Sequence, residues 1–216
     1  VHGRAIPASG RDTNGFALAT GLDCWHSFAV SDPGPSFLLA SPSLDCPVFG
    51  RSVVLLVDHD EDGSFGFVVS KASALSLPEI LRELKLEPGA RCEGIDVLRG
   101  GPVSEETGWV IFDPRGLGTL PGDTMHLRED LAVTASFEML EKIARDEGPE
   151  RGLLSLGYAG WGPGQLEDEL REGSWLPVDV DLATLFEVPF AERWDHSLAI
   201  LGIEPWRVVP RGSAQA

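Results

Sequence analysis

The sequence predicts an α+β protein, because short apolar strand patterns dominate its first half and helical patterns gather toward its end. The strand patterns are short and are bounded by Pro, Gly or Asp, whereas the helical patterns place apolar residues three and four positions apart. A chain of 216 residues, of which 43% are hydrophobic, can also bury a sizeable core.

The first expected strands are Phe37–Ala40, Val53–Val57 and Phe65–Ser70, and their unbroken hydrophobicity predicts burial on both faces. The acidic stretch 58–63 between the last two predicts a hairpin turn. This stretch also matches the opening of an EF-hand calcium loop. However, position 12 of that loop falls on Val69 instead of Glu, and strands flank it where helices are needed. We therefore expect a turn and no metal site.

The clearest helical pattern follows Ser76, which starts a capping box with Glu79. Apolar residues then recur at the i, i+3, i+4, i+7 spacing until Pro88 and Gly89 end the pattern. The later elements are expected in this order along the chain: strands at 95–98, 109–112 and 131–134, a helix at 136–147, a strand at 153–158, and helices at 163–172, 181–187 and 189–201.

The two ends of the chain lack such patterns. Residues 1–35 are rich in Gly, Ser, Asp and Pro, so we expect a disordered, mobile extension before a single domain over residues 36–206. Val1 in place of Met raises the hypothesis that the natural start is Val30, in which case the extension is never made. Residues 207–216 are expected to form a loose tail, whose VPRGS is compatible with a cloning remnant.

The charge balance argues against direct DNA binding. There are 34 acidic and 17 basic residues, which gives a formal net charge of -17. Binding duplex DNA requires Lys and Arg to neutralise phosphates, and the sequence contains no basic stripe that would do so. An acidic surface of this kind is typical of a protein kept soluble by its charge.

Cysteine usage and hydropathy point to the cytoplasm. The three cysteines are widely spaced and form no CxxC pair, which fits neither a disulfide framework nor a zinc site. No apolar run approaches the roughly 20 residues that a membrane span needs. Asp23 stands before Cys24 where a lipoprotein processing site needs a small residue, so export is not expected.

The run from Gly157 to Leu170, GYAGWGPGQLEDEL, places a glycine-rich segment before a helix and invites a nucleotide-binding hypothesis. Its spacing fits neither GxGxxG nor GxxxxGK[ST], and the carboxylates of residues 167–169 fill the first helical turn. Two interpretations stay open. In one, a tight turn lets Tyr158 and Trp161 cover a core edge. In the other, exposed Tyr158, Trp161 and Gln165 bind a partner protein.

A second glycine motif is Gly100-Gly101-Pro102, which predicts a turn where a strand leaves the sheet. Its backbone N–H groups are also an alternative carboxylate or oxyanion site. Asp195, His196 and Ser197 are triad residue types. Consecutive helical residues point about 100° apart, however, and cannot form one relay. We expect no catalytic residue, metal ligand or cofactor.

Three stretches, FLLASPSLDCPVFGRSVVLLVDHD, RGGPVSEETGWVIF and GYAGWGPGQLEDEL, resemble the YqgE/AlgH family of bacterial proteins, and the resemblance runs from about Phe37 to Leu201. It implies a mixed sheet curled into a barrel-like core with flanking helices. His59 matches a His of the family pattern. Ser70 stands where members usually carry Asn, which weakens any ligand site carried over. The family is usually described as transcriptional regulators without an established chemistry.

We therefore expect a cytoplasmic, non-enzymatic protein that acts through an unknown protein partner, with any effect on transcription indirect. The first alternative is an enzyme or small-ligand-binding protein that uses the glycine-rich segments with His59, and the second is a direct DNA-binding regulator. The candidate ligand or partner site consists of His59, Gly100, Gly101, Pro102, Tyr158, Trp161 and Gln165.

Overall fold

The computed structural model describes residues 35–203, which divide into two compact units. Within the described range, unit 1 comprises residues 75–96 and 106–154, and unit 2 comprises residues 35–74, 97–105 and 155–203. The expected N-terminal extension, apart from Pro35, and the expected C-terminal tail lie outside the described residues. The single domain over residues 36–206 stays a prediction.

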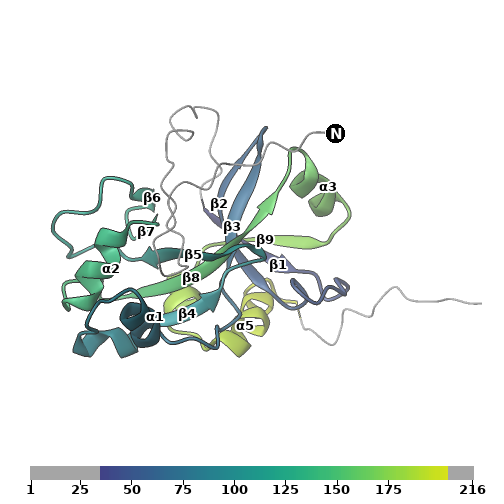
Figure 1. Ribbon diagram of the computed structural model, residues 1–216. Helices are drawn as coiled ribbons and strands as arrows, with labels where there is room; N and C mark the ends of the chain where they lie inside the picture. The colour runs from purple at the N-terminus through teal and green to yellow at the C-terminus, as the bar shows by residue number, and fades with distance from the viewer. Residues whose placement is uncertain (1–34, 204–216) are drawn as a thin grey trace, which may run out of the picture. The chain divides into compact units, whose positions relative to one another are not determined.

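Unit 2 is built on an antiparallel sheet (Figure 1). Its strand order is β8-β3-β2-β1-β9, and β4 also pairs with β8. Residues 37–40, 53–56 and 64–68 are buried, which confirms the burial expected from their unbroken hydrophobicity. The strands are β1 (Ser36–Ala40), β2 (Val53–Asp60), β3 (Gly63–Val68), β4 (Asp96–Arg99), the second half of β8 (Gly152–Trp161) and β9 (Trp175–Asp179).

The acidic stretch forms the turn of a hairpin between β2 and β3, as expected. His59 pairs with Ser64 and Asp60 with Gly63, so Glu61 and Asp62 alone form the turn. The Asp60 Oδ1 accepts hydrogen bonds from the backbone N–H of Asp62 at 2.7 Å and of Gly63 at 3.1 Å. This carboxylate therefore stabilises the turn of its own hairpin.

The helices of unit 2 are α3 (Gln165–Arg171), α4 (Leu182–Phe186) and α5 (Arg193–Ile200), with a 3₁₀ turn, η2 (Phe190–Glu192), before α5. The helix was expected over residues 189–201, but its first turn is a 3₁₀ turn and the α-helix begins only at Arg193. The Arg193 side chain donates to the carbonyl oxygens of Val188 and Val69. The Trp194 indole donates to the Ala40 carbonyl at 2.8 Å, so α5 is tied to the sheet beneath it.

Unit 1 holds the antiparallel strands β6, β7 and β5, two α-helices and a 3₁₀ turn. The capping box at Ser76 is present, because Glu79 accepts a hydrogen bond from the Ser76 backbone N–H at 2.9 Å. The elements are α1 (Leu77–Glu83), η1 (Ala90–Gly94), β5 (Val103–Phe112), β6 (Met125–Arg128), β7 (Leu131–Thr134), α2 (Phe137–Ala144) and the first half of β8.

The fold class is α+β, as expected, but the strand boundaries differ in instructive ways. Strands β6 and β9 were not predicted, and β5 begins at Val103 instead of Trp109. Strand β8 continues past the expected end at residue 158 to Trp161, so Gly160 lies within a strand and not in a loop. Pairing between backbones needs no apolar side chains, which is why hydropathy missed the polar start of β5, whereas Pro177 interrupts the apolar pattern of β9. Among residues 35–203, no helix has the length and apolar character needed to cross a bilayer.

Candidate functional site

All the candidate residues lie in unit 2, around the paired strands β3 and β8. Ser64 pairs with Trp161, Phe65 with Gly160 and Gly66 with Ala159. Successive side chains of a strand point to opposite faces, so Tyr158 and Trp161 project from opposite faces of β8. The predicted single patch is therefore two separate clusters. The Trp161 cluster contains His59, Ser64, Trp161, Gln165, Glu167, Glu169 and Trp175, and the Tyr158 cluster contains Phe65, Gly100, Gly101, Pro102, Tyr158 and Gly160.

Of the two interpretations of Trp161, the one that exposes it is wrong. Only 6% of Trp161 is accessible, and it packs in the apolar core of unit 2. Its ring stacks on Phe49 with centroids 6.4 Å apart and meets Trp175 edge-on at 5.8 Å. The alternation of β8 places Trp161 on the face that packs in this core, so Trp161 covers a core edge as the first interpretation held.

Glu169 links both tryptophans to α3. Its Oε2 accepts hydrogen bonds from the indole N–H of Trp161 at 2.9 Å and of Trp175 at 2.7 Å. Its Oε1 accepts from the Gln165 amide at 2.8 Å. The Gln165 amide oxygen in turn accepts from the Gly162 backbone N–H at 3.1 Å. Gln165 is exposed, as expected, but its polar atoms serve the turn that begins α3.

His59 lies in a row with Ser64 and Trp161 across β2, β3 and β8. Its Nδ1 is 2.7 Å from the Ser64 Oγ, and its Nε2 is 4.0 Å from Glu167 Oε1. In serine hydrolases the nucleophilic hydroxyl contacts His Nε2 and the carboxylate contacts His Nδ1. Here Ser64 contacts Nδ1 and Glu167 faces Nε2, so the two positions are exchanged. Ser64 fixes the orientation of the imidazole. Sequence analysis missed Ser64, although a two-residue hairpin turn places it opposite His59.

The Tyr158 cluster explains both glycines of the GGP motif. A Cβ on Gly100 would lie within 3.0 Å of Ser155 Oγ and the Gly157 carbonyl oxygen, and a Cβ on Gly101 would meet the Tyr158 backbone as closely. Gly101 also has a φ of 153°, which favours glycine. The Gly100 N–H donates to the Leu156 carbonyl at 2.8 Å. This donor is therefore committed within the protein and does not serve an anion nest.

Tyr158 is held firmly but is only half-buried. Its ring meets Phe65 edge-on with centroids 5.0 Å apart, and it lies beside Gly160, which has no side chain to cover it. Gly160 and Pro102 are both exposed. Within residues 35–203, no hydrogen bond engages the Tyr158 hydroxyl. The cluster thus presents a supported, half-buried aromatic ring.

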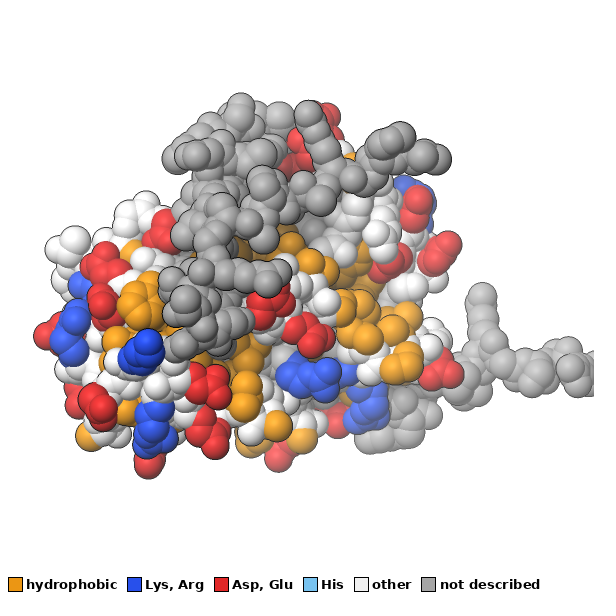
Figure 2. All heavy atoms as spheres, in the orientation of Figure 1, with side chains coloured by type: hydrophobic (Ala, Val, Ile, Leu, Met, Phe, Trp, Pro, Cys, Tyr) orange, Lys and Arg blue, Asp and Glu red, His pale blue; other side chains and the backbone are white. Residues whose placement is uncertain are grey.

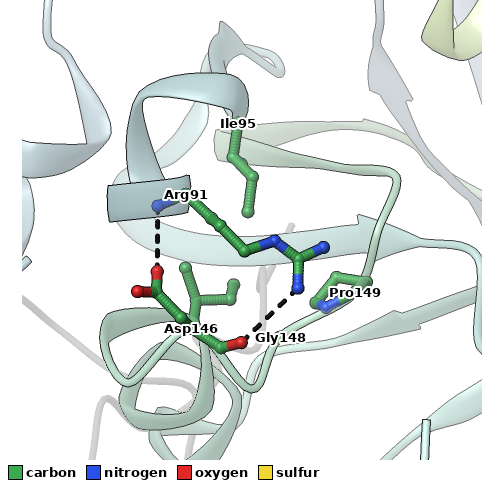
Figure 3. Close-up of a pocket in the computed structure, with 6 residues that line it drawn as sticks. Arg91, Ile95, Asp146, Gly148 and Pro149 are labelled. Carbon is green, nitrogen blue, oxygen red and sulfur yellow. Dashed lines mark hydrogen bonds between the residues drawn. The ribbon is translucent and has the colours of Figure 1, made fainter. Parts of the chain in front are cut away.

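A separate pocket lies in unit 1 between η1 and the end of α2 (Figure 3). The Asp146 carboxylate accepts hydrogen bonds from the backbone N–H of Ala90 at 3.1 Å and of Arg91 at 2.9 Å. The volume of this pocket is about 10 Å³, far below the range of about 300–1,000 Å³ typical of small-molecule sites. The pocket is therefore a small hollow beside a helix cap.

Most ion pairs in the described residues neutralise arginines locally. Asp113 in unit 1 meets two guanidinium groups, and hydrogen bonds from Arg115 hold the pKa of its carboxyl well below the usual range. On the face in Figure 2, Lys and Arg side chains stand among Asp and Glu side chains. No three His, Cys, Asp or Glu side chains in residues 35–203 converge as metal ligands would. The basic residues within 4.0 Å of a carboxylate include Arg51, Arg115, Arg128, Lys142, Arg145, Arg151 and Arg171.

Comparison with known proteins assigns the family, because residues 37–206 match the family model described as AlgH-like. The chain belongs to the AlgH-like family. The UPF0301 protein AlgH of Pseudomonas aeruginosa is 44% identical over 169 residues, which are 77% of this chain and 87% of that protein. A UPF0301 protein of Delftia acidovorans is 39% identical over 181 residues, which are 81% of this chain and 91% of that protein.

Solved structures confirm the AlgH-like fold. The solution structure of AlgH from Pseudomonas aeruginosa matches with a TM-score of 0.68 at 40% identity, covering 88% of this chain and 100% of that one. A crystal structure of a protein from Corynebacterium diphtheriae matches with a TM-score of 0.62 at 20% identity, covering 80% and 90%, and supports the fold alone. The curled sheet with flanking helices implied by the AlgH-like motifs is thus confirmed.

Proposed function

We propose that the protein acts in the cytoplasm by binding a partner protein, and that any effect on transcription is indirect. The Tyr158 cluster is the contact surface of this proposal. A half-buried aromatic ring that is already fixed by Phe65 loses little conformational entropy on binding. Its hydroxyl can hydrogen-bond a partner, and the exposed Pro102 beside it adds apolar contact area. Rigid aromatic side chains of this kind dominate the energetics of protein interfaces.

The acidic net charge supports an indirect effect on transcription. A net charge of -17 repels a polyanion, and the described ion pairs place arginines such as Arg51, Arg128 and Arg171 against carboxylates. An arginine that already neutralises a carboxylate contributes less to counterion release from DNA. These observations favour a protein partner over a duplex.

The contact surface is tested by photo-crosslinking in the native host. Tyr158 is replaced by p-benzoylphenylalanine, which keeps an aromatic ring at the position and couples to neighbours on illumination. We expect a discrete crosslinked species from this position and none from the same group at Glu172, an exposed residue of the same unit. Equal crosslinking from both positions, or none from Tyr158, would contradict the proposal.

Direct DNA binding is tested separately by fluorescence anisotropy with a random duplex at physiological ionic strength. We expect no binding at micromolar protein. Micromolar affinity that falls steeply with added salt would instead favour the DNA-binding alternative.

Cell fractionation tests the cytoplasmic location, which the free cysteines Cys46 and Cys92 support.

A further inference from the structure

Two positively charged side chains lie opposite each other where the segment after β3 runs beside β4. Ala72 pairs with Leu98 in an antiparallel bridge, and the Arg99 backbone N–H donates to the Lys71 carbonyl at 2.9 Å. Lys71 and Arg99 are therefore directly opposite residues, and their side chains share one face. Like charges in this position destabilise a sheet, so stability does not explain the pair.

No carboxylate in the described residues balances these two cations. Neither side chain has an Asp or Glu oxygen within 4.0 Å in residues 35–203, whereas Arg51 and Arg171 of the same unit pair with carboxylates. The Lys71 ammonium donates to the Val48 carbonyl instead. The Arg99 side chain is exposed, so its guanidinium can bind an anion from solution.

The surroundings of Lys71 favour a reactive amine. Lys71 is half-buried, and burial lowers the pKa of its amine; an ionised Cys46 would oppose this shift, whereas the charge of Arg99 adds to it. Partial desolvation beside a second cation is one way in which proteins make a lysine nucleophilic. When the amine is neutral, one N–H can still donate to Val48 while the nitrogen lone pair stays available.

The other lysines of the chain lie in different surroundings. The sequence contains three lysines, Lys71, Lys85 and Lys142. Lys142 on α2 pairs with Glu138 at 3.5 Å, and Lys85 is an exposed residue just after α1. Neither lies in a pair of strands, so neither has a cation opposite it as Lys71 has. The chain therefore carries its own reference amines.

We propose that Lys71 is a site of acylation by acyl phosphates, with Arg99 binding the phosphate group of the donor. A guanidinium binds phosphate oxygens through two parallel hydrogen bonds, which suits an unpaired Arg99 to this class of donor. The neutral Lys71 amine attacks the acyl carbon, and the bond from this carbon to the phosphate oxygen breaks. The phosphate leaves with the electron pair of that bond and takes up the proton that the amine loses.

The product amide removes the positive charge of Lys71 but keeps one N–H for the Val48 carbonyl. Acylation therefore changes the charge of this surface without removing the contact to Val48. The inference does not require the proposed partner protein.

Treatment of the full chain with acetyl phosphate near neutral pH tests the proposal, and peptide mass spectrometry follows each lysine separately. We expect Lys71 to be acetylated about three-fold or more faster than Lys85 and Lys142, because a larger fraction of its amine is neutral. With N-hydroxysuccinimidyl acetate, an uncharged donor, the advantage of Lys71 should shrink, because Arg99 has no phosphate to bind.

The substitution Arg99→Gln should slow acetylation of Lys71 by acetyl phosphate about three-fold or more and leave Lys85 unchanged. The matched control is Arg171→Gln, which changes the net charge equally at an exposed residue of the same unit and should keep the wild-type rate at Lys71. Lys71 reacting no faster than Lys85 would overturn the proposal, as would an Arg99→Gln variant with the wild-type rate. An equal advantage with both donors would refute phosphate binding by Arg99.

Discussion

Removing the carboxylate of Glu169 should destabilise the protein far more than its half-exposed position implies. Glu169→Ala takes away the acceptor of two indole N–H groups, on Trp161 and Trp175, whose residues are only 6% and 2% accessible. Each buried donor left without a partner costs about 1–3 kcal/mol. Because water can enter from the half-exposed side of α3, we expect a total loss of about 2–4 kcal/mol in the free energy of unfolding.

Urea unfolding followed by tryptophan fluorescence measures this loss, since both affected indoles report directly on the site. A thermal melt should show a decrease in Tm of about 4–16 °C, because about 1 kcal/mol shifts Tm by about 2–4 °C in a chain of this size. Glu169→Gln keeps one acceptor oxygen, so its loss should be smaller, about 1 kcal/mol.

The control for general helix effects is Glu172→Ala, which should change stability by less than about 0.5 kcal/mol, as exposed substitutions usually do. If Glu169→Ala were no more destabilising than Glu172→Ala, the two indole hydrogen bonds would contribute nothing measurable. The assignment of Glu169 as the link between α3 and the core of unit 2 would then be refuted.

Three further outcomes are expected. Gly101→Ala, whose Cβ would clash with a neighbouring backbone, should cost about 3 kcal/mol or more, whereas Gly122→Ala, which meets nothing within 4 Å, should be neutral in the same thermal melt. Asp113→Asn should lose about 2 kcal/mol at pH 7. Because the Asp113 pKa is depressed, wild-type stability should fall as the pH drops below about 4, and this fall should be shallower in the variant during acid titration followed by circular dichroism. Burial raises the pKa of the Cys92 thiol, so iodoacetamide should label Cys92 of the native protein slowly and the half-exposed Cys46 faster. Peptide mapping measures the two labelling rates, and equal rates would contradict this expectation.

Local features were predictable because their causes are local. The capping box at Ser76 and the hairpin turn within the acidic stretch 58–63 involve groups within a few positions of one another. The apolar period of α1 likewise placed Leu77, Ile80 and Leu81 in the core. In each case the hydrogen bond or the buried face belongs to the segment itself.

The candidate site was predictable only in part. Sequence patterns singled out Trp161 and Gln165 but could not choose between a core edge and an exposed patch for Trp161, because the acceptor of its indole lies on the next helix. Gly101 was expected at a turn, and its closest neighbour is the Tyr158 backbone on another strand. The spacing between residues on different strands depends on pairing, which composition does not encode.

The amino-acid sequence by itself determined the fold class, the family and the acidic character of the protein, since hydrophobic period, motif spacing and charge are properties of the chain. The tertiary structure alone decided that Trp161 lies on the buried face of β8, and that Glu169 and Ser64 complete the surroundings of Trp161 and His59. The reason is that a shift of one residue in strand register exchanges the two faces. The pairing of β8 with its neighbouring strands, β3 among them, sets that register.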